Sequence, residues 1–135
     1  MSRSDIILPG RYSEYELLSG FIATFAKRER YSALFIEALQ LSMKEAFVNA
    51  IKHGNGGRED LTVSCRLLAT ANTLLACIRD CGKGFNPQEQ PSPVTPLHLF
   101  KLSGRGLYII QSIAEIVALE CDGHGCTLML RYIPY

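Results

Sequence analysis

Apolar side chains recur along the chain with two different periods, which predict its helices and strands. Residues 13–28 and 32–53 carry apolar positions three and four apart, the spacing of one helix face. The second segment ends at Gly54, a residue type that commonly closes helices. We therefore expect two helices near the beginning of the chain and a further helix over residues 104–116.

The segment 32–53 carries two apolar stripes on nearly opposite sides. The first stripe consists of Ile36, Leu39, Met43, Phe47 and Ala50. The second consists of Leu34, Leu41 and Val48, which are seven residues apart. A helix that is apolar on two sides is typically buried between layers, so we expect both stripes to be covered.

Short segments rich in Leu, Val, Thr and Cys predict strands, four of them paired as hairpins. The expected strands cover residues 5–9, 61–69, 73–79, 117–122 and 126–133. Residues 85–103 hold four of the six prolines and are expected to form a loop. This order of elements favours an α+β two-layer sandwich, with a mixed, mostly antiparallel sheet and helices on one face.

The length and charge of the chain narrow its functional class. A length of 135 residues predicts one domain, over residues 1–135. The net charge is +1 and the basic residues are scattered, which does not favour nucleic-acid binding. No apolar run is long enough to span a membrane, and the first residues lack a signal-peptide core. We expect a cytoplasmic protein that binds neither nucleic acid nor membrane.

The cysteines predict no particular chemistry. Five are present, namely Cys65, Cys77, Cys81, Cys121 and Cys126. Reduced thiols are the expected state in the cytoplasm. A zinc site that includes His124 is an alternative, but the spacings match no standard zinc motif. Buried thiols in strands are the simpler interpretation.

Three polar residues, Glu45, Asn49 and His53, follow one another at intervals of four on the second predicted helix. Steps of four place side chains along one edge of a helix. That edge lies between the two apolar stripes, where a shielded carboxylate requires a partner or a ligand. The row fits either a binding site or a set of local contacts on the helix.

Three glycine-containing segments are the other candidates for chemistry. In Asp80-Cys81-Gly82-Lys83-Gly84, the glycines permit close backbone approach to a ligand, and the carboxylate can accept a hydrogen bond from an amine. Ser103-Gly104-Arg105-Gly106-Leu107 opens a helix, whose free N–H groups suit phosphate. Gly125-Cys126-Thr127 precedes the last predicted strand. Each segment alone also fits an ordinary turn.

Taken together, these segments resemble the boxes of the GHKL (Bergerat-fold) ATPase and kinase superfamily, in the same order and spacing. Residues 41–54 resemble the N box, residues 79–85 the G1 box and residues 104–110 the G2 box. Residues 125–127 resemble the final Gly-Thr-Thr element. The chain is most similar to bacterial anti-sigma-factor serine/threonine kinases. Those kinases bind a sigma factor and phosphorylate a serine of an anti-anti-sigma partner.

The resemblance implies ATP and Mg²⁺ as cofactors and a role for each matching residue. Glu45 is expected to act as the general base, and Asn49 as the Mg²⁺ ligand. Asp80 is expected to recognise adenine, with support from Thr127. The resemblance also implies a lid over residues 85–103. The remaining ATP-binding residues would be Gly82, Gly84, Gly104, Arg105, Gly106 and Leu107.

The same resemblance implies a sigma factor and an STAS-type anti-anti-sigma protein as partners, and a homodimer. Two positions depart from the family pattern. Leu102 stands where some anti-sigma kinases carry an arginine that reaches the γ-phosphate, and Cys126 replaces the first Thr of the final element. The alternative function is therefore a nucleotide-responsive, partner-binding switch with little or no kinase activity. His53 is expected to have a structural role at the helix end.

Overall fold

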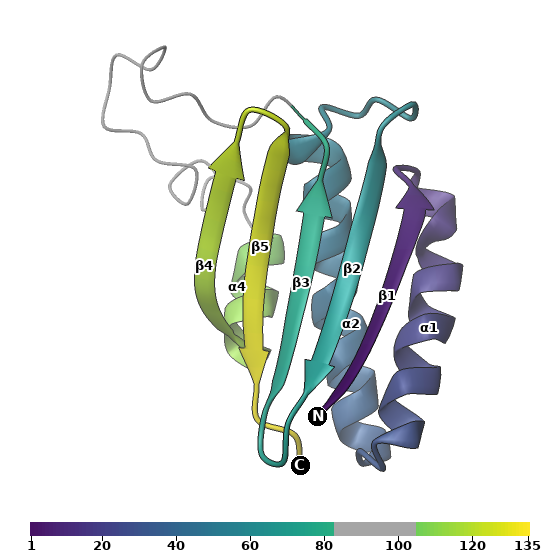
Figure 1. Cartoon of the computed structure of the whole chain (residues 1–135), viewed down its shortest axis with the longest axis vertical. Coiled ribbons are helices and arrows are strands. Elements are labelled where there is room, and N and C mark those ends of the chain that lie inside the picture. Colours follow the sequence, from purple (N-terminus) through teal and green to yellow (C-terminus); the bar gives the residue numbers. More distant parts are fainter. Residues whose placement is uncertain (83–104) are drawn as a thin grey trace.

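A single antiparallel sheet with helices on one face forms the fold (Figure 1). The computed structural model describes residues 1–82 and 105–135. The strands are β1 (Ser2–Pro9), β2 (Thr62–Ala69), β3 (Leu74–Asp80), β4 (Glu115–Asp122) and β5 (Gly125–Tyr132). The helices are α1 (Tyr15–Arg28), α2 (Ala33–Asn49) and α4 (Arg105–Ile113), with a short 3-10 helix η1 (Tyr12–Glu14) and a π-helical turn η2 (Ala50–Gly54).

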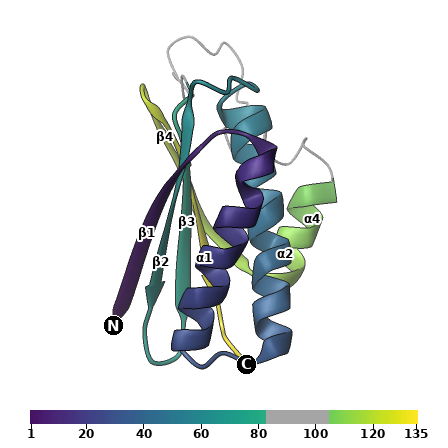
Figure 2. The ribbon, with the colours of Figure 1, turned by 90° about the vertical axis from the view of Figure 1, so that its right-hand side faces the viewer.

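The sheet has the strand order β1-β2-β3-β5-β4, and each neighbouring pair is antiparallel. Viewed from the side, α1, α2 and α4 lie on the same face of the sheet (Figure 2). The predicted α+β two-layer sandwich is confirmed. The parallel component allowed by a mixed sheet does not occur among the described strands.

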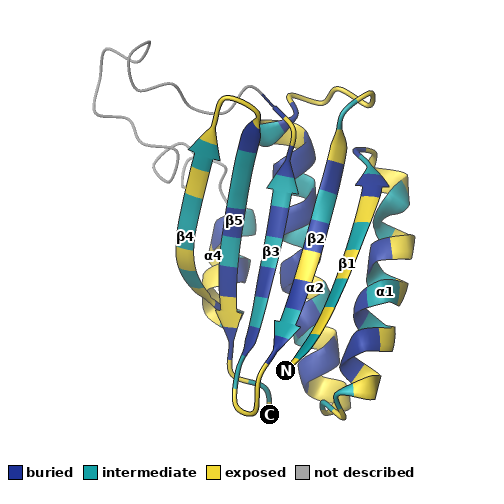
Figure 3. Cartoon of the chain, in the orientation of Figure 1, coloured by how far each residue is buried: buried dark blue, intermediate teal, exposed yellow. Residues whose placement is uncertain are grey.

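The core fills the space between the sheet and the helices. Strand side chains alternate between the two faces, so every second residue of β2 and β3 is buried (Figure 3). The sheet contributes buried side chains that include Val63, Leu67, Leu74, Ala76 and Ile78. The helices contribute Leu18, Ile22, Phe25, Phe35, Leu39 and Phe47 to the same core. Within the described residues, no helix is long and apolar enough to cross a membrane.

The second apolar stripe of α2 is not covered, which corrects the prediction from its pattern. Leu34 is 71% exposed and Leu41 is 48% exposed, while Val48 is half-buried. The helix places one face on the sheet and its flanks against α1 and α4, as Figure 2 shows. No further layer of described residues lies over its outer side.

Tertiary pairing also moves the ends of two elements. The helix α4 ends at Ile113 rather than at residue 116, because Glu115 and Ile116 pair with β5. β1 begins at Ser2 rather than at residue 5, because Ser2, Arg3 and Ser4 pair with the end of β2. The helix α2 begins where expected, since the Ser32 hydroxyl accepts a hydrogen bond from the backbone N–H of Phe35 at 3.1 Å.

Candidate functional site

The carboxylate of Asp80 lies at the end of β3 and is only 6% exposed. Its Oδ1 accepts hydrogen bonds from the backbone N–H groups of Gly82 and Cys126, both at 3.1 Å. None of the described residues donates a hydrogen bond to Oδ2. Burial raises the pKa of Asp80, and the two backbone bonds act in the opposite direction. One carboxylate oxygen is thus fixed by the backbone, while the other can accept a hydrogen bond from a ligand.

Three glycines allow the surrounding backbone to pack tightly around Asp80. A Cβ at Gly54 would lie 2.0 Å from Asp80 Oδ2. A Cβ at Gly82 would lie 1.7 Å from the carbonyl oxygen of Gly54, and one at Gly125 would lie 2.1 Å from that of Asp80. Any side chain at these positions would push apart the end of η2, the end of β3 and the start of β5.

Glu45 and Asn49 lie one turn apart on α2, beside the first turn of α4. Asn49 is 7% exposed, and its Nδ2 has no hydrogen-bond partner among the described residues. A Cβ at Gly106 would lie 3.0 Å from Glu45 Oε2 and 3.2 Å from Asn49 Nδ2. The fold thus brings together three of the predicted site residues, and it leaves a buried amide that a ligand can satisfy.

These polar groups fit a magnesium ion better than a transition metal. Mg²⁺ takes oxygen ligands and commonly uses one or two protein groups, with water and phosphate completing its shell. The amide oxygen of Asn49 matches that requirement, and its unpartnered Nδ2 can donate a hydrogen bond to a phosphate oxygen. In the described part of the chain, no three His, Cys, Asp or Glu side chains gather as a metal site, and this includes the cysteines considered for zinc.

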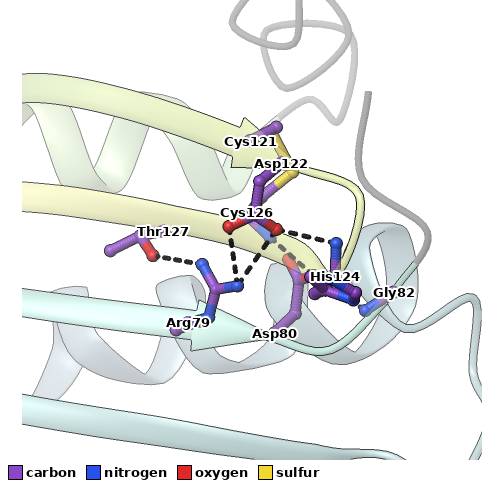
Figure 4. Close-up of a disulfide and its surroundings, with 8 residues drawn as sticks. All are labelled: Arg79, Asp80, Gly82, Cys121, Asp122, His124, Cys126 and Thr127. Carbon is purple, nitrogen blue, oxygen red and sulfur yellow. Dashed lines mark hydrogen bonds and ion pairs between the residues drawn. A yellow bond between two sulfur atoms is a disulfide. The ribbon is translucent and has the colours of Figure 1, made fainter. Parts of the chain in front are cut away.

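Thr127 lies away from this site. Its side chain shares a sheet face with Arg79, because the two residues are opposite each other in the pairing of β3 with β5. The Thr127 hydroxyl accepts a hydrogen bond from Arg79 Nη1 at 3.0 Å, and Arg79 also pairs with Asp122 (Figure 4). Asp80, the next residue after Arg79, faces the other way. The predicted adenine role of the Thr127 side chain therefore does not fit its placement.

Some of the remaining predicted site residues lie on α4 or η2, and others lie outside the described residues. Leu107 is buried, and Arg105 begins α4. Gly84, Gly104 and the predicted lid over residues 85–103 lie outside the described residues. His53 belongs to η2, where burial and then the charge of Lys52 lower its pKa.

The cysteines correct an expectation, because Cys121 and Cys126 form a disulfide (Figure 4). The register of β4 with β5 places these two residues directly opposite each other. Cysteine count and spacing do not reveal such a neighbour, since it follows from the hairpin register. Cys65, Cys77 and Cys81 are free.

Asn55 is a buried polar residue that the sequence patterns did not single out. It is 2% exposed, its Oδ1 accepts a hydrogen bond from the N–H of Cys81 at 2.8 Å, and its Nδ2 donates to the carbonyl of Thr62 at 3.1 Å. In the sequence it precedes two glycines and is typical of a turn. Its burial depends on contacts with distant segments.

Comparisons with known proteins show the family of the chain. Residues 8–132 match the family model described as a histidine kinase-like ATPase domain. A serine-protein kinase RsbW of Listeria monocytogenes is 25% identical over 118 residues, which are 83% of this chain and 75% of the relative. The Bacillus subtilis protein of the same name is 28% identical over 114 residues, 80% of this chain and 71% of the relative.

A solved structure supports the fold. The crystal structure of the RsbU and RsbW domains of Rv1364c from Mycobacterium tuberculosis superposes with a TM-score of 0.64 at 16% sequence identity. The match covers 99% of this chain and 33% of that chain, so the present sequence spans about a third of its length.

Proposed function

Because the chain belongs to the histidine kinase-like ATPase domain family, we propose that it is an ATP-dependent serine/threonine protein kinase with an anti-sigma role. The proposed kinase binds a sigma factor and phosphorylates a serine of an STAS-type anti-anti-sigma partner in the cytoplasm. The main structural support is the close approach of Gly106 to Glu45 and Asn49. The name of the similar RsbW proteins, serine-protein kinase, supports the reaction class.

Asp80 is proposed to select adenine. Two backbone N–H groups orient its carboxylate through Oδ1, so Oδ2 is available to accept a hydrogen bond from the adenine amino group. Gly82 and Gly84 would allow the backbone to lie close to the base. The proposed lid, residues 85–103, would exclude water during transfer.

The phosphates are proposed to lie between α2 and the start of α4. Gly104, Arg105, Gly106 and Leu107 would present backbone N–H groups at the helix N-terminus, where the helix dipole favours negative charge. Asn49 would bind Mg²⁺, which when bound neutralises phosphate charge. Glu45, one helical turn earlier, would accept the proton of the attacking serine hydroxyl.

A pair of glutamate variants on α2 tests this proposal. Full-length protein first captures its partner from a lysate of the source organism. The captured partner is then incubated with the protein and labelled ATP. We expect Glu45→Gln to reduce transfer by about a hundredfold or more, as removal of a general base does, while ADP still binds. The matched control is Glu37→Gln, because Glu37 is an exposed glutamate on the same helix. Equal transfer by both variants would exclude Glu45 as the base.

The second candidate is a nucleotide-responsive switch that binds its partner and transfers little or no phosphate. The switch is favoured by Cys126, which replaces a family threonine and forms a disulfide with Cys121. Leu102 also supports it, because some anti-sigma kinases carry at this position an arginine that reaches the γ-phosphate. Wild-type protein that binds ADP and its partner but transfers no label would favour this switch. We propose a single domain over residues 1–135 and a homodimer under either function.

A further inference from the structure

Asn55 connects the end of η2 with the start of β2 and with the residue that follows β3. It follows η2, its Nδ2 donates to Thr62 at the start of β2, and its Oδ1 accepts from Cys81, just after β3. The amide also lies against the first loop, because a Cβ at Gly10 would be 2.9 Å from Nδ2. A buried amide with both ends occupied fixes the relative position of these segments.

The side chain of Asn55 is not needed to close its own helix. The backbone N–H of Asn55 already donates to the carbonyl of Ala50 at 2.8 Å, which closes the π-helical turn. Both side-chain bonds instead reach other segments. The side-chain amide therefore holds the ends of β2 and β3 in place and does not stabilise the helix that precedes it.

The contact with Cys81 bears directly on Asp80. Cys81 lies between Asp80 and Gly82, and the N–H of Gly82 turns back to Asp80 Oδ1 at 3.1 Å. The Cys81 N–H donates to Asn55 Oδ1 at 2.8 Å, and this bond fixes the peptide between Asp80 and Cys81. The fixed peptide in turn holds Gly82 where its N–H can reach Asp80 Oδ1. Without Asn55, the Cys81 N–H loses its acceptor within the protein and this turn is free to reorient.

We propose that Asn55 is a positioning residue, which fixes the Asp80–Gly82 turn and thereby sets discrimination between adenine and guanine. This inference rests on the proposed function. Adenine presents an amino group to Asp80 Oδ2, whereas guanine presents a carbonyl oxygen at the corresponding ring position. A carboxylate accepts a hydrogen bond from the first and repels the second, provided that its orientation is fixed.

The test compares ADP and GDP binding by calorimetry for full-length wild type, Asn55→Ala and Asn55→Asp. We expect Asn55→Ala to weaken ADP binding by about tenfold, because the turn that orients Asp80 is no longer held, and to reduce the ADP-over-GDP preference. Asn55→Asp keeps an acceptor for Cys81, so it should preserve more of the preference. If the alanine variant does not fold, Asn55→Ser takes its place, because the shorter hydroxyl side chain cannot keep both hydrogen bonds.

Two controls separate positioning from loss of stability. Asn72→Ala alters an exposed asparagine in the β2–β3 turn, and Leu74→Val weakens the core at the start of β3. Both should bind ADP and GDP as wild type does. Hydrogen exchange should show faster exchange of the Cys81 amide in Asn55→Ala but not in the two controls.

The outcomes distinguish this inference from the proposed function. Wild-type protein that binds no ADP contradicts both. If the wild type prefers ADP and folded Asn55→Ala keeps the same affinity and preference, this inference is wrong and the proposed function is unaffected. The inference is equally overturned if Leu74→Val loses the preference to the same extent as Asn55→Ala.

Discussion

At the scale of single residues, the site depends on polar groups that are buried with incomplete partners. Asp80 has one oxygen bound by two backbone N–H groups, and Asn49 has an amide nitrogen without a partner in the described residues. Such groups destabilise a fold unless a ligand or a backbone group satisfies them. We interpret the Asp80 carboxylate and the Asn49 amide as groups that lower the stability of the free protein and bind a ligand. Substitution of Asp80 tests this interpretation.

Asp80→Asn should separate stability from nucleotide binding. The amide oxygen can still accept from Gly82 and Cys126, but the buried charge disappears. The raised pKa of Asp80 means that the folded protein binds its proton more tightly than the unfolded chain, so stability decreases as pH rises from the ordinary value of 3.8 through the folded pKa. At pH 7 we expect Asp80→Asn to be more resistant to urea than wild type.

The same variant should lose ADP affinity, because its amide nitrogen would face the adenine amino group as a second donor. The stability advantage should disappear below pH 3.8, where the carboxyl group is protonated in both states. A variant that is less stable than wild type at pH 7 would show that the charge of Asp80 does not destabilise the fold.

Gly106→Ala should impair the site through a steric contact. Its methyl group would lie 3.0 Å from Glu45 Oε2 and 3.2 Å from Asn49 Nδ2, so the ends of these two side chains must move by a few tenths of an ångström. We expect ADP-Mg²⁺ binding to weaken in a calorimetric titration. The control is Gly20→Ala in α1, where no atom lies within 4 Å of the new methyl group. Because alanine favours a helix, the control should gain about 0.5–1 kcal/mol of stability and bind normally.

At the scale of elements, α2 joins the core to the site. Its inner face packs against the sheet, its end carries Glu45 and Asn49, and η2 continues to Gly54 beside Asp80. The apolar pattern alone suggested two buried faces, but the structure buries only one. The reason is that a two-layer sandwich offers a helix one sheet and two helical neighbours, and nothing on its outer side.

A pair of leucine variants tests this one-sided packing. Leu39 is fully buried and Leu41 is about half exposed, although the two are only two residues apart. Leu39→Ala should lower the free energy of unfolding by about 2–5 kcal/mol, through lost burial and a cavity. Leu41→Ala should change it by about 0.5 kcal/mol. Equal losses in urea unfolding would indicate that the outer face of α2 is covered by another surface.

At the scale of the whole molecule, the site is assembled from the ends of elements and not from one segment. The end of α2, the end of β3, the start of β5 and the start of α4 each supply a part. The opposite face of the sheet bears ion pairs, including Arg66 with Asp5 and Arg131 with Glu115. Ligand binding should therefore stabilise the fold as a unit.

This coupling predicts a thermal shift. A ligand that binds only the folded state stabilises it by about 2.7 kcal/mol when present at about 100 times its Kd. We expect ADP with Mg²⁺ to raise the Tm of the wild type, as measured by calorimetry or fluorescence. Asp80→Asn should show a much smaller shift at the same ADP concentration. An equal shift in both proteins would indicate that ADP binds elsewhere.

The sequence by itself determined the order of elements, the α+β class and the helix edge with Glu45 and Asn49. These follow from periodicity and from the distance between residues a few positions apart, which local geometry sets. The family match extends over the same elements.

Only the tertiary structure decided which face of each element is used. Thr127 and Asp80 fall on opposite sides of the sheet, Cys121 pairs with Cys126, and Asn55 is buried among three segments. Strand register and the packing of distant ends determine these outcomes, and a shift of one residue reverses the face of every strand side chain. That dependence on long-range pairing is the physical reason that the pattern of residues along the chain could not reveal them.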